Sequence, residues 1–225
     1  MTPSLPPVLA EVAVSAGAVE ASQPAWITVA AFLGIAHAVM LALIPFIRMP
    51  PHALGFGARY VVLLAQGFGS GRLRPAPGTW GSMVGIGWLV ALLSLGNVWG
   101  FLAGTLAGLA VSVWACDRAG RILGEKDPGC IVIDEIAALP LAWLGVWVLQ
   151  GLGRWEMPPP MDAAFWRLWP ELVVAFGAFR LFDIWKPGWV GRSQDLPRGW
   201  GVTADDVLAA LLAALPVAGV AWMRH

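Results

Sequence analysis

The feature that most constrains the fold is the alternation of long apolar segments with three short polar stretches. Apolar residues make up 58% of the 225 residues and charged residues only 12%, whereas charged residues form about a quarter of an ordinary soluble domain. Segments of roughly 20 apolar residues have the length of membrane-spanning helices. The sequence therefore predicts an all-α, polytopic membrane bundle.

Six segments without central charge are candidate membrane helices. The second is short for a span, and the fifth carries Arg167, Pro170 and Glu171. Segment 53–68 is apolar but is interrupted by Arg59, which predicts an interfacial helix. The six candidate spans lie near residues 26–47, 79–95, 98–116, 131–150, 165–182 and 205–223.

The first 25 residues differ from the rest of the chain. They contain no Lys or Arg, carry only Glu11 and Glu20, and are rich in Pro, Ala, Ser and Val. A secretory signal peptide would begin with a positively charged region. Residues 1–25 are therefore expected to form a disordered tail that precedes an extra N-terminal membrane helix at 26–47.

The polar stretches, which we define as residues 69–82, 117–135 and 180–206, hold nine of the fourteen acidic and nine of the fourteen basic residues. In the six-helix arrangement, 11 basic residues fall on the side of these stretches and only Arg154, Arg167 and Arg224 on the other. Basic residues prefer the cytoplasmic side. We therefore expect all three stretches to face the cytoplasm and both chain ends to lie outside.

The composition also excludes some classes of protein and partner. The formal net charge is zero, which argues against a nucleic-acid partner. Fourteen Trp against one Tyr fit aromatic belts at the two membrane interfaces. Cys116 and Cys130 lie on or beside a stretch placed in the cytoplasm, so they are expected to be reduced.

The first polar stretch combines glycines with small polar residues. The glycine-rich run Gly67-Phe-Gly-Ser-Gly71 leads into it, and Pro77-Gly-Thr-Trp-Gly-Ser82 ends it. Free backbone amides at a helix start can hold phosphate, which makes Gly78, Thr79 and Ser82 candidate phosphate-binding residues. A plain loop followed by Thr79 as a helix N-cap is the alternative.

The second polar stretch ends with two adjacent acids, Asp134 and Glu135, at the start of an apolar helix. Favourable placement near the helix dipole explains one acid better than two. A carboxylate taken into the membrane costs about 2.5–3.5 kcal/mol and indicates a functional site. Adjacent helical residues point about 100° apart, so one acid is expected to reach the site and the other its edge. Asp127 is a candidate general acid or outer-shell base.

The third polar stretch contains Arg180, Asp183 and Lys186 at a spacing of three. They would share one helix face if the helix continued to Pro187, either as a salt-bridge ladder or as phosphate-binding cations beside a metal ligand. Further on, residues 203–206 (Thr-Ala-Asp-Asp) resemble a capping box. Capping would use Thr203 and Asp206, which leaves Asp205 unexplained.

Five carboxylates are thus expected to converge at the inner ends of the fourth, fifth and sixth helices. Each like-charge pair at about 4 Å would cost roughly 4 kcal/mol at an effective dielectric near 20, so positive charge must lie among them. Oxygen ligands without Cys or His favour Mg²⁺ over zinc. The candidate metal ligands and catalytic acids are Asp134, Glu135, Asp183, Asp205 and Asp206.

Four motifs in this order, spread over about residues 58–222, resemble those of the phosphatidylglycerophosphatase A family. They are Pro77-Gly-Thr-Trp-Gly-Ser82, Ile131-Val-Ile-Asp-Glu135, Phe179-Arg-Leu-Phe-Asp-Ile-Trp-Lys-Pro187 and Gly199-Trp-Gly-Val-Thr-Ala-Asp-Asp206. The chain departs from the family at Gly188, where a second Pro is usual, and at Ala138 and Ala210, where Gly is frequent. These departures affect loop shape and packing and spare the carboxylates.

The resemblance implies that residues 53–223 form a helical, Mg²⁺-dependent lipid phosphatase of the bacterial inner membrane. Such an enzyme converts phosphatidylglycerophosphate to phosphatidylglycerol, with membrane phospholipids as its partners. Mg²⁺ on the carboxylates would bind phosphate oxygens and polarise a water, and Arg180 and Lys186 would bind the remaining oxygens. A covalent aspartyl-phosphate route stays open.

Three other functions are compatible with intramembrane acids. Intramembrane acids also build the pathways of cation- or proton-coupled transporters, but these acids lie at helix ends beside basic residues, which suits a lipid headgroup better. A scaffold that has lost activity is disfavoured because every carboxylate of the motifs is present. A phosphatase acting on another lipid phosphate is the remaining alternative.

Overall fold

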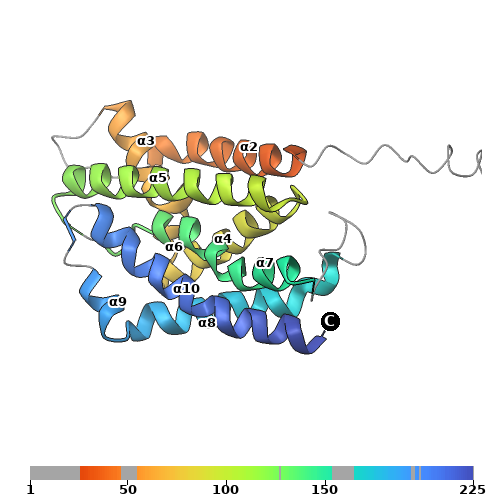
Figure 1. Ribbon diagram of the computed structural model, residues 1–225. Helices are drawn as coiled ribbons and strands as arrows, with labels where there is room; N and C mark the ends of the chain where they lie inside the picture. The colour runs from red at the N-terminus through yellow and green to blue at the C-terminus, as the bar shows by residue number, and fades with distance from the viewer. Residues whose placement is uncertain are drawn as a thin grey trace, which may run out of the picture.

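A computed structural model shows a bundle of helices (Figure 1). It describes residues 26–46, 55–126, 128–153, 165–193, 196–197 and 199–224. No β-strand occurs in these ranges, in agreement with the all-α prediction. The predicted tail at 1–25 lies outside the described residues.

The α-helices and shorter 3₁₀ segments follow one another along the chain. They are α2 (Trp26–Leu43), η1 (Ile44–Phe46), α3 (Phe56–Ala65), η3 (Gly67–Arg72), α4 (Pro77–Leu93), α5 (Val98–Leu123), α6 (Ile133–Ala138), η4 (Leu139–Trp143), α7 (Leu144–Gly151), η5 (Phe165–Leu168), α8 (Trp169–Trp185), α9 (Trp189–Arg192) and α10 (Gly199–Arg224).

Each of the six predicted spans contains a helix, and α3 occupies the segment predicted to be interfacial. Four segments among the described residues are long and apolar enough to cross a membrane: Trp26–Phe46, Val98–Leu123, Ile133–Gly151 and Gly199–Arg224. Helices α4 and α8 have 17 residues each. The structure confirms a helical bundle with membrane-spanning elements, and the number of six crossings stays a prediction.

The fourth predicted span is not one regular helix. It divides into α6, the 3₁₀ segment η4 and α7. Pro140 lies at the start of η4 and has no backbone N–H to continue an α-helical hydrogen-bond ladder. This broken span is the central element of the bundle, because 67% of its apolar window is buried, compared with 17% for α2.

Two helix starts differ from the capping interpretations of the sequence. Helix α10 begins at Gly199, so Thr203 lies inside the helix and the capping-box interpretation is wrong. Helix α4 begins at Pro77, a residue favoured in the first turn, so Thr79 is not its N-cap. At Gly199 a side-chain Cβ would lie 2.1 Å from the carbonyl oxygen of Val113, and this close approach joins the first turn of α10 to α5.

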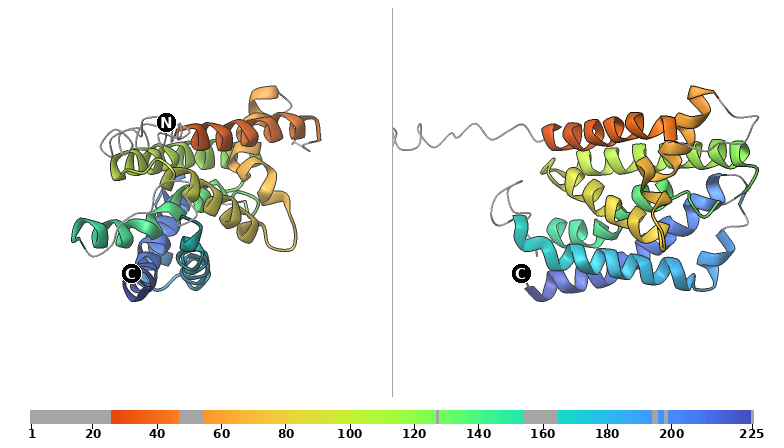
Figure 2. Two further views of the ribbon diagram at one scale, coloured as in Figure 1. Left: turned by 90° about the vertical axis from the view of Figure 1, so that its right-hand side faces the viewer. Right: turned by 180° about the vertical axis from the view of Figure 1, so that it is seen from behind.

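The helices form two outer pairs around a centre. Figure 1 and Figure 2 show α2 beside α5 along one side of the bundle, α8 beside α10 along the opposite side, and α4 and α6 between them. The start of α2 and the end of α10 lie at one end of the bundle. The ends of α5 and α8 and the start of α10 lie at the other.

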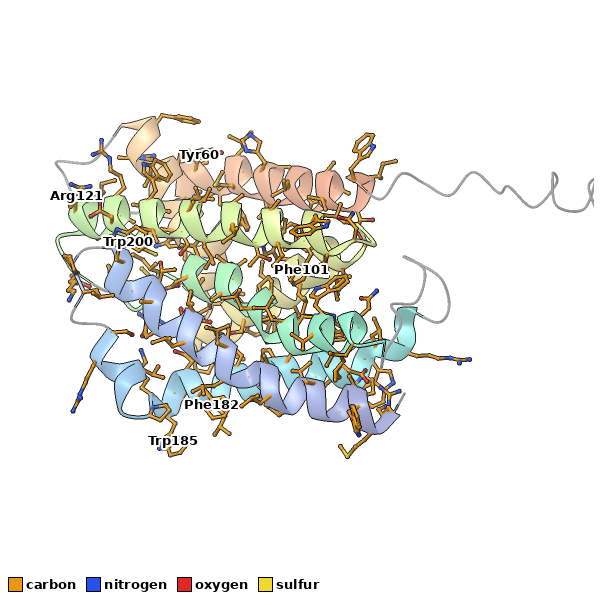
Figure 3. The ribbon with its side chains drawn as sticks, viewed as in Figure 1. Tyr60, Phe101, Arg121, Phe182, Trp185 and Trp200 are labelled. Atoms are coloured by element: carbon orange, nitrogen blue, oxygen red, sulfur yellow. The ribbon has the colours of Figure 1, made fainter. Side chains whose placement is uncertain are left out.

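Exposed tryptophans lie at both ends of the bundle: Trp26 and Trp222 at one end are 62% and 52% exposed, and others lie at the end with the polar stretches. Figure 3 shows Arg121, Trp185 and Trp200 at this end. Trp185 is 67% exposed and Trp200 is 64% exposed. Indole rings at this level are typical of a membrane interface, which fits the aromatic belts predicted from the composition.

Candidate functional site

The start of α6 is fixed by contacts with the first polar stretch and with α3. The backbone N–H of Val132 donates a 2.9 Å hydrogen bond to the carbonyl oxygen of Ala65. A Cβ at Gly71 would lie 2.1 Å from the carbonyl oxygen of Cys130, so only glycine permits this backbone approach. One glycine of the motif that suggested phosphate binding therefore serves packing beside the site.

Three carboxylates from two helices form the tightest cluster in the described part of the chain. Asp183 belongs to the last turn of α8, and Asp205 and Asp206 belong to the buried face of α10. One oxygen of each lies within 4.8 Å of the others. Asp205 and Asp206 are each only 3% exposed, so this negative charge is held largely out of water.

The two acids of α6 point to different partners, as their adjacent positions predict. The backbone N–H of Glu135 donates a 3.1 Å hydrogen bond to Asp134 Oδ1, and Asp134 is 5% exposed. The Glu135 carboxylate instead contacts Ser82 and Arg180. Both acids therefore line one cavity with the buried acids of α10, and the Glu135 carboxylate in addition contacts α4 and α8.

Arg180 links α8 to α6. Its NH1 lies 2.6 Å from Asp183 Oδ2 and 3.2 Å from Glu135 Oε1. The Arg180 side chain is 17% exposed, so both ion pairs are shielded from water. This guanidinium connects the three-carboxylate cluster to Glu135.

Lys186 reaches the cluster from the C-cap of α8, because the helix ends at Trp185 and Lys186 has a left-handed backbone with φ 45°. Its ammonium pairs with Asp205 and lies 4.0 Å from Asp183 Oδ1. Burial lowers the pKa of Lys186, but the hydrogen bond to Asp205 and the charges of Asp205, Asp183 and Asp206 outweigh burial and raise the pKa above its ordinary 10.5. Lys186 is therefore a permanent cation of the site.

The first turn of α4 is pressed against Glu135. The Ser82 hydroxyl lies 2.7 Å from Glu135 Oε2 and 2.8 Å from the carbonyl oxygen of Gly78, and Ser82 is fully buried. A Cβ on Gly78 would lie 2.3 Å from Glu135 Oε1 and 2.9 Å from Arg180 NH1. Because Gly78 carries only a hydrogen there, the Glu135 carboxylate and the Arg180 guanidinium can lie against the backbone of α4.

These groups surround a polar cavity of about 160 Å³. Its lining unites residues from all three polar stretches, together with the apolar side chains of Val132 and Val202. The predicted site residues in the lining are Gly78, Asp134, Glu135, Asp183, Lys186, Asp205 and Asp206.

The remaining predicted site residues lie elsewhere. Arg180 pairs with two acids of the lining, Ser82 lies behind Glu135, and Thr79 is half-buried outside the lining. Asp127 lies outside the described residues. The Ser112 hydroxyl, 3.0 Å from that of Thr203, joins α5 to α10 near Asp206, a contact that no sequence spacing indicates because the residues are 91 positions apart.

The donor set around the cavity suits a hard cation. Five carboxylates of the lining meet two basic side chains, Arg180 and Lys186, so acidic groups outnumber basic ones around the cavity among the described residues. The closest three acids offer only oxygen ligands, and hard divalent cations prefer such ligands. Asp183, Asp205 and Asp206 could therefore hold a hard divalent cation.

Comparison with known proteins points to one family. Residues 63–221 match the family described as Phosphatidylglycerophosphatase A. A protein of Haemophilus influenzae with that name is 38% identical over 163 residues, covering 72% of this chain and 89% of the relative. A protein of Escherichia coli with the same name is 30% identical over 156 residues, covering 68% and 78%.

A third relative carries a different name. A protein of Bacteroides thetaiotaomicron named "Putative phosphatidylinositol-3-phosphatase" is 30% identical over 166 residues, covering 72% of this chain and 94% of the relative. No solved structure matches the chain. All five carboxylates of the cavity fall inside the matched residues 63–221, whereas α2 falls outside.

Proposed function

Because the chain belongs to the phosphatidylglycerophosphatase A family and is a phosphatase, we propose that it hydrolyses phosphatidylglycerophosphate to phosphatidylglycerol and phosphate. The observation that carries this proposal is the cavity in which Asp183, Asp205 and Asp206 lie beside Lys186. Buried acids beside a basic residue can hold a cation and an anionic phosphate together.

Mg²⁺ is the proposed cofactor, held by Asp183, Asp205 and Asp206. When bound, such an ion neutralises phosphate charge and activates water. Phosphoryl transfer depends mostly on positioning and charge neutralisation. A cluster of oxygen ligands with its own cationic side chains provides both.

The side chains of the protein itself have two proposed roles, phosphate binding and proton transfer. Lys186 and Arg180 bind phosphate oxygens with charge-assisted hydrogen bonds when the substrate displaces part of their present pairing with acids. Water attacks phosphorus, the bond from phosphorus to the glycerol oxygen breaks, and a proton passes to that oxygen. Glu135 lines the cavity outside the three-carboxylate cluster, and we assign proton transfer to it.

The proposed location is the cytoplasmic face of the bacterial inner membrane. The distribution of basic residues supports it, with 11 on the side of the polar stretches and three on the other. A cysteine introduced by Leu5→Cys should react with an impermeant maleimide on intact cells. Reaction only after permeabilisation would show that the N-terminus lies inside and that the proposed orientation is wrong.

Activity is tested with purified protein in detergent micelles by measuring phosphate release from phosphatidylglycerophosphate. EDTA should abolish release and Mg²⁺ should restore it. Asp206→Asn should lower kcat/KM by about 100-fold or more, since even outer-shell partners of metals cost 10- to 100-fold. Asp117→Asn is the matched control, because Asp117 pairs with Arg121 at the same end of the bundle outside the cavity.

Equal phosphate release with EDTA, or an Asp206→Asn variant as active as the wild type, would remove the basis for the metal assignment. The Bacteroides relative makes phosphatidylinositol 3-phosphate the second candidate substrate. Both lipids are therefore assayed side by side. A higher kcat/KM for phosphatidylinositol 3-phosphate would contradict the proposed substrate and leave the phosphatase assignment intact.

A further inference from the structure

A second, larger cavity lies between α2 and the rest of the bundle. It has a volume of about 380 Å³ and is bounded by α2 and α3 on one side and by α4, α5 and α6 on the other. Figure 2 shows α2 running alongside α5 at the edge of the bundle. We call this cavity the α2 groove.

The α2 groove is apolar along almost its whole lining. His37 and Tyr60 carry most of its polar atoms, and they hydrogen-bond to each other at 3.2 Å. The other residues of the lining are glycines or carry aliphatic, aromatic or thioether side chains. A water molecule in such a groove would find few of the two to four polar partners that it needs.

Small residues of α5 form one wall of the groove. Gly104, Ala107 and Gly108 line it. A Cβ at Gly104 would clash with Leu92 of α4, so this glycine serves close packing, while Ala107 is exposed and presents only a methyl group. Across the groove Leu33 is 48% exposed, and Val111 beside the small residues is 43% exposed. The groove is therefore open to the surroundings of two helices that are long and apolar enough to span a membrane.

The groove and the acidic cavity lie on different faces of α6. Ile133, Ile136 and Ala137 line the groove, while Asp134 and Glu135 line the acidic cavity, and the two linings have no residue in common. The backbone of α6 separates them. A hydrocarbon chain bound in the groove would contact α6 on the face away from the acidic cavity. It would not enter the site of hydrolysis.

One wall of the groove comes from the segment that the family match does not include. The match begins at residue 63, so α2 and Tyr60 lie before it. Phe32 and Met40 pack on the bundle, but only 17% of the apolar window of α2 is buried, which leaves most of this helix surface uncovered. A ligand that fills the groove would add contacts between α2 and residues 63–221, which match the family.

We propose that the α2 groove binds an acyl chain of a membrane phospholipid other than the substrate, and that this chain fastens α2 to the bundle. Two features identify a hydrocarbon chain: the apolar lining, which offers water few polar partners, and the opening beside two helices that are long and apolar enough to span a membrane. Separation from the acidic cavity identifies it as a resident lipid. This inference adds a binding site to the proposed function and does not depend on it.

The first test fills the groove. Ala107→Phe places a ring in it from an exposed position on α5, and Ala110→Phe, also exposed but outside the lining, is the matched control. Lipids retained after purification in mild detergent are counted by native mass spectrometry. Wild type and Ala110→Phe should each retain about one phospholipid more per chain than Ala107→Phe. Equal lipid content in all three proteins would overturn the proposal.

Kinetics separate a resident lipid from the substrate. With a resident lipid, Ala107→Phe should keep the wild-type KM for the lipid phosphate, whereas a KM raised several-fold in this variant alone would show that the groove takes a substrate chain. The wild type gives an independent readout with a phospholipid that carries a photoreactive group in its acyl chain. Crosslinks should map to residues of the groove lining such as Ile133 or Ile136, which are 5% and 3% exposed, and crosslinks confined to residues outside the lining would contradict the proposal.

Discussion

Gly78→Ala is the most direct test of the contact between α4 and Glu135, the acid to which we assign proton transfer. The change adds one methyl group in the first turn of α4. That carbon would lie 2.3 Å from Glu135 Oε1 and 2.9 Å from Arg180 NH1. Since 3.4 Å is the lower limit of ordinary contact, the carboxylate must move by about 1 Å.

The size of the effect follows from what Glu135 would lose. Its carboxylate is held by Ser82 at 2.7 Å and by Arg180 at 3.2 Å, and a shift of 1 Å weakens both contacts. A misplacement of about 1 Å can reduce a rate by about 100-fold. Overpacking costs about 1–3 kcal/mol of stability, and the better helix propensity of Ala offsets up to about 1 kcal/mol of it.

The assay compares phosphate release by Gly78→Ala and by Gly177→Ala. Gly177 is also helical, in α8, but a Cβ there would meet nothing within 4 Å. Gly177→Ala should therefore keep wild-type kcat/KM and gain about 0.5–1 kcal/mol of stability. Gly78→Ala should lose about 100-fold in kcat/KM while remaining folded by thermal unfolding in detergent.

Two results would refute this reasoning. If Gly78→Ala kept kcat/KM within about twofold of the wild type, the Glu135 carboxylate would not need its present position. If Gly177→Ala lost as much activity as Gly78→Ala, the loss would report a general effect of substitution in the helices. Either outcome would remove the case for proton transfer by Glu135.

Three further predictions concern the polar contacts. Ser82→Ala should lower kcat about 10-fold by removing one hydrogen bond to Glu135, and Ser82→Thr should restore it; a wild-type kcat in Ser82→Ala would contradict this role. Arg224→Ala removes the 2.7 Å bonds to the fully buried Glu171, so the free energy of unfolding should fall by about 3–5 kcal/mol with unchanged kcat/KM, and unchanged stability would refute it. Because its pKa is raised above 10.5, Lys186 stabilises the fold fully below pH 10.5 and loses this effect as pH rises through its folded pKa. The stability difference from Lys186→Met should thus not decline between about pH 6 and about pH 9, and a decline within this range would disprove it.

Helix positions were predictable because apolar length is a local property. Each predicted span contains a helix, and Asp134 and Glu135 lie in the first turn of α6 as expected. Helix starts were less predictable. Thr203 has the sequence features of a cap, yet α10 begins at Gly199 because its first turn packs closely on α5, and local capping signals carry no information about such tertiary packing.

Side-chain contacts between distant helices could not be predicted from the sequence. Ser82 was a candidate for phosphate, but the structure turns its hydroxyl to Glu135, 53 positions away. The Ser112–Thr203 contact between α5 and α10 is of the same kind. Hydrogen bonds of this range depend on helix rotation and packing, which the order of residues does not express.

The sequence by itself determined the class of the protein and the end of the bundle at which its chemistry lies. Apolar segments of bilayer length leave few positions for charge, so the acids and bases collect between them, and ordered motifs then indicate the family. Only the tertiary structure decided which acids meet. It grouped Asp183, Asp205 and Asp206, directed Glu135 to Ser82 and Arg180, and opened a groove behind α6. Those outcomes depend on distances of a few ångströms between helices, and such distances are set by packing after the chain has folded.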